Sequence, residues 1–181
     1  MRIATGGAER AKLVKRALFV GVTLFLLCVA QSTVLGRWKL FGAVPDLMLC
    51  AVVLLGYCNG REEGAVGGIA AGTMTAMLGT VGVTVDPIFY MVMGYVCGYF
   101  ARAIYPKRFL PYLFFLGATL PFGAIRTVIS ACLAYGNPRP AMLFLYAILP
   151  EAAGTFLCGA ALFFPLRWLL GKKKERRDVK R

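Results

Sequence analysis

Three ionisable side chains, Asp46, Arg126 and Glu151, lie within stretches of sequence that are otherwise apolar enough to cross a membrane. A charged side chain at bilayer depth is costly, so such residues usually form an internal ion pair or serve a substrate or ion pathway. Arg126 lies 11 residues before Asn137, and Glu151 lies 11 residues after Pro140. Because a helix rises about 1.5 Å per residue, two antiparallel helices would hold both side chains at the same depth. The spacing predicts an intramembrane ion pair between Arg126 and Glu151, with a substrate site as the alternative.

Asp46 stands at the start of an apolar stretch, directly after Pro45. Proline suits the first turn of a helix, and a carboxylate there interacts favourably with the helix dipole. We therefore expect Asp46 either to cap a helix or to belong to a functional site.

The sequence offers little else that could carry catalysis. It contains no histidine, which excludes a histidine general base and makes a zinc site of the usual kind unexpected. It also lacks the GxxxxGK[ST] phosphate-binding loop and the GxSxG nucleophile motif. We therefore expect a protein that is not an enzyme and that binds neither a metal nor a cofactor.

The elements that must hold these charges are long apolar stretches in a chain of mean hydropathy +0.71. Ala17–Gly36 and Gly64–Val85 contain no ionisable acid or base over 20 and 22 residues. About 20 apolar residues suffice to cross a bilayer as a helix. The sequence predicts an all-α membrane bundle over residues 17–170, flanked by basic segments at 1–16 and 171–181. The other four expected transmembrane helices are Leu40–Asn59, Pro87–Tyr105, Phe109–Tyr135 and Ala141–Leu166.

The net charge of +13 is distributed unevenly along the chain. With six spans, 17 Lys and Arg residues fall on the side of the two termini and 3 on the opposite side. The positive-inside rule then predicts a multi-pass membrane protein with both termini cytoplasmic. The basic tail is expected to meet anionic membrane lipids, at about 1 kcal/mol per basic residue. No aromatic residue follows Trp168 to stack on bases, so nucleic acid is not an expected partner.

Small residues recur at helical spacing in two of the stretches. Gly64, Gly68 and Gly72 follow one another every four residues, and Gly94 and Gly98 repeat the pattern. Such a face lets two helix backbones approach closely in a membrane. It could pack inside the bundle or receive the transmembrane helix of another protein, and we take these five glycines as candidates for a partner-helix interface.

Four motifs over residues 45–100 together resemble the family of rod shape-determining MreD proteins. In order, they are Pro45-Asp46-Leu47 at a helix start, the GxxxGxxxG pattern from Gly64 to Gly72, Gly79-Thr80-Val81-Gly82, and Gly94-Tyr95-Val96-Cys97-Gly98. The family often has an aspartate where this chain has Ala76, so any role of that acid is absent here or displaced.

The resemblance implies a fold similar to the substrate-capture subunits of energy-coupling-factor transporters. It also implies a location in the bacterial cytoplasmic (inner) membrane. There the chain would be a non-enzymatic component of the cell-elongation complex, which directs rod shape and peptidoglycan synthesis. The implied partners are MreC, the glycosyltransferase RodA with its penicillin-binding transpeptidase, and, indirectly, MreB filaments.

The main alternative is a substrate-binding membrane subunit of an energy-coupling-factor vitamin transporter, because the two functions share a fold. Such a subunit usually gathers polar and aromatic side chains in its outward loops. Here the loop after the third stretch offers mainly Thr84 and Asp86, which is little for a ligand pocket. A lipid flippase or scramblase is a third possibility.

Overall fold

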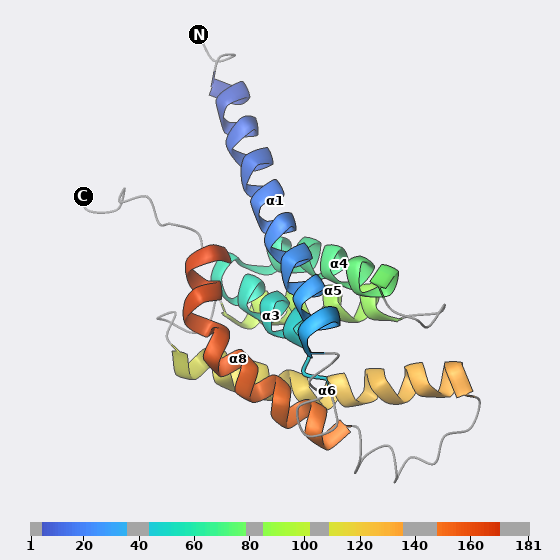
Figure 1. Cartoon of the computed structure of the whole chain (residues 1–181). Helices are drawn as coiled ribbons and strands as arrows, with labels where there is room; N and C mark the ends of the chain where they lie inside the picture. Colours follow the sequence, from blue (N-terminus) through green and yellow to red (C-terminus); the bar gives the residue numbers. More distant parts are fainter. Residues whose placement is uncertain (1–4, 36–43, 79–84, 102–108, 136–147, 171–181) are drawn as a thin grey trace.

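The computed structural model describes residues 5–35, 44–78, 85–101, 109–135 and 148–170, and these residues form helices without any strand (Figure 1). This agrees with the all-α fold expected from the sequence. The elements are α1 (Thr5–Ala30), the π-helical turn η1 (Gln31–Leu35), α3 (Leu47–Asn59), α4 (Arg61–Leu78), α5 (Asp86–Ala101), α6 (Phe109–Tyr135) and α8 (Leu149–Leu170).

Consecutive helices run in alternating directions. At one end of the bundle, Gln31 of η1 accepts a hydrogen bond of 3.2 Å from the backbone N–H of Met48 at the start of α3. Late in α4, Gly72 packs against Pro87 at the start of α5.

At the opposite end of the bundle, the end of α5 meets the start of α4, and the start of α6 meets the end of α8. Gly98, late in α5, lies against Arg61 at the start of α4. The rings of Phe109, at the start of α6, and Phe163, late in α8, are 5.1 Å apart. The start of α1 and the end of α8 therefore point toward the same end of the bundle.

Among the residues that the structure describes, three helical stretches are long and apolar enough to cross a membrane: Val14–Thr33, Phe109–Ile129 and Leu149–Leu169. The six-span prediction is therefore confirmed only in part. Helix α3 is apolar but has 13 residues, which is about 20 Å and shorter than a bilayer core of about 30 Å.

The structure gives the bounds of several expected elements. Helix α1 begins at Thr5, so residues 5–16 of the expected basic segment 1–16 are helical and continue into the first apolar stretch; in Figure 1 the beginning of α1 extends beyond the other helices. Helix α6 has the expected bounds, and α8 spans Leu149–Leu170, whereas the expected start at Ala141 lies outside the described residues. The basic tail at 171–181 lies outside the described residues.

Helix α3 is the centre of the bundle. All its residues from Leu47 to Cys58 are buried. A helix that is apolar on every side, as this one is, requires neighbours on every side. Helices α4, α5 and α8 supply most of them, and α1 and α6 complete the shell.

Helices α4 and α5 pack through their glycines. A Cβ added to Gly64 would overlap the carbonyl oxygen of Gly94 and lie 2.9 Å from its carbonyl carbon. A Cβ on Gly68 would lie 2.5 Å from the carbonyl carbon of Tyr90. Real Cβ atoms almost never approach other atoms to less than 3.0 Å, so the two backbones meet at a distance that only glycine permits.

The close approach that these glycines allow is used by two helices of this chain, which agrees with packing inside the bundle, one of the two uses that the sequence left open. Their use as an interface for a partner helix stays a prediction. The buried glycines concerned are Gly64, Gly68, Gly72, Gly94 and Gly98.

Candidate functional site

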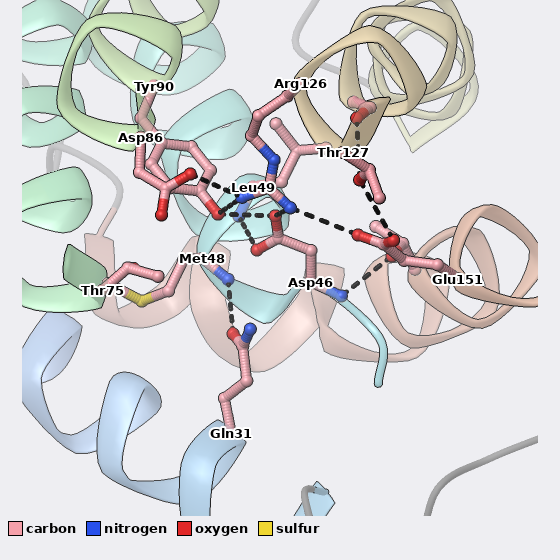
Figure 2. Close-up of polar contacts among 12 residues, drawn as sticks. Gln31, Asp46, Met48, Leu49, Thr75, Asp86, Tyr90, Arg126, Thr127 and Glu151 are labelled. Atoms are coloured by element: carbon pink, nitrogen blue, oxygen red, sulfur yellow. Dashed lines mark hydrogen bonds and ion pairs between the residues drawn. The ribbon is translucent and has the colours of Figure 1, made fainter. Parts of the chain in front are cut away.

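A single guanidinium lies among carboxylates from three other helices (Figure 2). Arg126 of α6 forms ion pairs with Asp46 at 3.3 Å, Asp86 at 3.2 Å and Glu151 at 3.2 Å. The predicted pair of Arg126 and Glu151 is present, but it is one of three. We refer to Asp46, Asp86, Tyr90, Arg126 and Glu151 as the Arg126 cluster.

Tyr90 connects the acidic and basic members of the cluster. Its hydroxyl donates a hydrogen bond of 2.5 Å to Asp46 and accepts one of 2.9 Å from Arg126. The guanidinium carbon of Arg126 also lies 5.5 Å from the ring centroids of Phe89 and Tyr90. At this distance both rings can contribute cation–π attraction.

Asp46 caps a helix, as one of its two expected roles required, and it also binds Arg126 and Tyr90. One carboxylate oxygen accepts a hydrogen bond of 2.9 Å from the backbone N–H of Leu49 and caps α3, while the other faces Arg126 and Tyr90. The backbone N–H of Asp46 donates to the hydroxyl of Thr155 in α8 at 2.9 Å. Asp46 is therefore held from α3, α5, α6 and α8.

The other members of the Pro45-Asp46-Leu47 motif support this position by packing. Pro45 and Leu47 are both buried. The ring of Pro45 lies against Gly154 of α8, where a Cβ would meet it at 3.4 Å. The motif therefore fixes the start of α3 against α8.

Each carboxylate of the cluster stands at the N-terminus of a helix. Asp46 caps α3, Asp86 is the first residue of α5, and Glu151 lies in the first turn of α8. Three carboxylates and one guanidinium carry a formal charge of −2. Each helix N-terminus contributes about +0.5 of an elementary charge, so three of them offset most of this excess.

A small cavity of about 20 Å³ adjoins the cluster. A cavity of this size holds about one water molecule, whereas small-molecule pockets measure roughly 300–1,000 Å³. Its lining residues are Asp46, Leu49, Leu120, Gly123, Ala124, Ile148, Glu151, Ala152 and Thr155.

Sequence reasoning missed two members of the cluster, Asp86 and Tyr90. Asp86 was counted as a loop residue, and Tyr90 was given no role. A signal was present: Asp86 precedes Pro87 at the start of an apolar stretch, which is typical of a helix N-terminus. Tyr90 follows four residues later, which places it on the same helix face as Asp86.

The arrangement favours holding helices together over reacting with a ligand. Asp46, Asp86 and Glu151 are all bound to Arg126, and Thr127 donates a further bond of 3.3 Å to Glu151. Within the described ranges, no group of three His, Cys, Asp or Glu side chains is arranged to hold a metal ion.

Comparisons with protein-family models, with curated proteins and with solved structures found nothing that matches this chain. The resemblance of its motifs to the MreD family stays a prediction.

Proposed function

We propose that this chain is a non-enzymatic integral membrane component of the bacterial cell-elongation complex. In this role it acts with MreC to scaffold or regulate the cell-wall synthases, RodA and its penicillin-binding transpeptidase, with MreB filaments as indirect partners. The motifs over residues 45–100 suggest the complex, and the Arg126 cluster supports a scaffolding role within it.

The supporting observation is that the charged side chains of the Arg126 cluster bind one another. A capture subunit would direct polar groups into a cavity of ligand size. Here Arg126 directs its guanidinium to three carboxylates, at 3.2–3.3 Å, and the adjoining cavity has room for about one water. This geometry joins the helices that carry these side chains.

The vitamin-transporter subunit is the second candidate, and one observation favours it. The cavity beside the cluster is lined by oxygen-bearing side chains of Asp46, Glu151 and Thr155 together with apolar residues. A few polar groups in an apolar wall are typical of small-molecule sites.

Co-purification separates the two candidates. We expect the tagged chain, extracted from its native membranes, to retain MreC when the complex is analysed by mass spectrometry. A tagged multi-pass protein of unrelated function from the same membranes is the control and should not retain it. Failure to recover MreC, together with a small vitamin that stays bound through purification, would replace the elongation-complex proposal with the transporter proposal.

The proposed topology has six spans with both termini cytoplasmic. Its support is the 17-to-3 distribution of basic residues and the alternating helix directions. Reporter fusions after Asn59, Val85 and Tyr105 should report the cytoplasm, the periplasm and the cytoplasm, in that order. A periplasmic location for a fusion at the C-terminus would contradict this topology.

A further inference from the structure

Helix α6 is anchored unevenly along its length. Its buried side chains, Tyr112, Phe115, Leu116 and Thr119, all precede Pro121. Beyond Pro121, none of the α6 side chains that the structure describes is buried. The exposed apolar side chains of this second half are Phe122, Ile125, Ile129 and Leu133.

The change in packing coincides with a weak point in the helix. Pro121 has no backbone N–H, so it cannot donate to the carbonyl of Gly117 four residues earlier. Gly123 follows two residues later, and glycine is about 1 kcal/mol less favourable than alanine inside a helix. Sharp bends in helices occur almost always at such positions.

Polar contacts bind the second half of α6 to the other helices. Arg126 binds the three carboxylates of the cluster and Tyr90. Thr127 donates to Glu151 at 3.3 Å. These contacts lie five and six residues beyond Pro121, on the side of α6 that faces α3, α5 and α8.

The cavity beside the cluster lies at the same level as this weak point. Leu120, Gly123 and Ala124 form its wall on α6, and α3 and α8 supply the opposite wall. A turn of α6 at Pro121 would move Gly123 and Ala124 away from α3 and α8 and would enlarge the cavity.

We propose that residues 122–135 of α6 form a gate that turns about Pro121, is held closed by the Arg126 cluster, and opens the cavity between α3, α6 and α8. The gate does not depend on the proposed partnership with MreC. The charged cluster is then both the joint that orders the bundle and the contact that keeps residues 122–135 closed.

The motion is large enough to measure. Cys132 lies 11 residues beyond Pro121, which is about 16 Å along the helix. A turn of about 20° at the proline would move Cys132 by about 6 Å. Cys132 is exposed and can carry a spin label, whereas Cys28, Cys50, Cys58 and Cys97 are buried and protected from labelling.

The test is a distance measurement by pulsed electron paramagnetic resonance on the full chain in lipid nanodiscs. One label is placed on Cys132 and the other on Met77→Cys, because Met77 is 84% exposed near the end of α4, at the same end of the bundle as Cys132, so that the line between the labels lies across α6 and not along it; the half-buried Cys158 is changed to Ala. We expect one distance in the otherwise unmodified chain. In Arg126→Met we expect a second population at a distance that is longer by up to about 6 Å.

Two further variants guard against a folding defect and test the hinge. The milder double variant Thr127→Val/Glu151→Gln weakens the contacts of α6 with Glu151 of α8 and leaves those with Asp46 and Asp86. It should also produce the displaced population. Adding Pro121→Ala to either latch variant restores the helix hydrogen bond and should remove that population.

A reference pair reports on the first half of α6. Phe114 is 71% exposed and lies before the hinge, so labels on Phe114→Cys and Trp168→Cys, with Cys132→Ser and Cys158→Ala, should keep one distance in every variant. An unchanged Cys132 distance in both latch variants would overturn the gate. So would a displaced population that persists with Pro121→Ala, or an equal displacement of the reference pair.

Discussion

Gly68→Leu is expected to abolish the monodisperse yield of the purified protein. A Cβ at this position already overlaps the carbonyl oxygen of Tyr90 and lies 2.8 Å from the Cα of Met91, so α5 must move away from α4. Overpacking usually costs about 1–3 kcal/mol, and a clash with backbone belongs at or above the upper end of that range. The displaced residue, Tyr90, also holds Asp46 and Arg126, so the charged cluster would be disturbed as well.

Two alanine variants serve as controls for Gly68→Leu. At Gly67 the new Cβ meets the end of the Leu55 side chain, which can move, so Gly67→Ala should retain most of the yield. At Gly21 no atom lies within 4 Å, so Gly21→Ala should raise the stability of α1 by up to about 1 kcal/mol. Size-exclusion profiles and thermal unfolding of the three variants provide the measurement. If Gly68→Leu keeps its normal yield but no longer co-purifies with MreC, the face of Gly64, Gly68 and Gly72 would be an interface for a partner helix.

Arg126→Met is expected to be the most damaging single change in the charged cluster. It leaves the carboxylates of Asp46, Asp86 and Glu151 without their shared cation at buried or partly buried positions. Breaking a buried ion pair by removing one partner costs about 3–5 kcal/mol. Thermal unfolding in a fixed detergent should therefore show a large loss of stability.

Neutralising one acidic partner is expected to cost less stability than removing Arg126. In an isolated ion pair the two single changes would cost about the same. Glu151→Gln keeps a side chain of the same shape and leaves Arg126 bound to Asp46 and Asp86, so its cost should stay below about 1.5 kcal/mol. The double variant Arg126→Met/Glu151→Gln still leaves two carboxylates unpaired, so it should remain close to Arg126→Met. Recovery of near-normal stability in the double variant would indicate an isolated pair and would contradict the three-carboxylate cluster.

The sequence could predict that the chain is helical but could not predict which helices pack against one another. Apolar stretches and the equal spacing of Arg126 and Glu151 from their connecting segment predicted an all-α fold and one true contact. Gly64 and Gly68 showed where backbones approach closely, but a small-residue pattern is the same whether the neighbour belongs to this chain or to another. Only the packing of α5 onto α4 shows that helices of this chain use it.

The cluster itself was hidden because its members are distant in the sequence. The bond between Asp46 and Thr155 joins residues 109 positions apart, and that between Tyr90 and Asp46 joins residues 44 apart. No local period encodes such contacts. Helix bounds failed for a local reason: Asp46 caps α3 at Leu47, although the apolar stretch begins earlier.

Arg126, the cation of the cluster, is synthesised after two of the three carboxylates that it binds. During synthesis, α3 and α5 emerge with the carboxylates of Asp46 and Asp86 before α6 has delivered Arg126. Until then, the carboxylates of Asp46 and Asp86 have no cation to bind. Of the helices that carry them, α3 also lacks its contacts with α6 and α8, and α5 lacks those with α6. Nascent chains that stop before Phe109 should therefore be preferred substrates for membrane quality-control proteases, whereas chains that include α6 and α8 should escape them. The carboxylates that stabilise the complete bundle would thus also make an incomplete chain recognisable to these proteases.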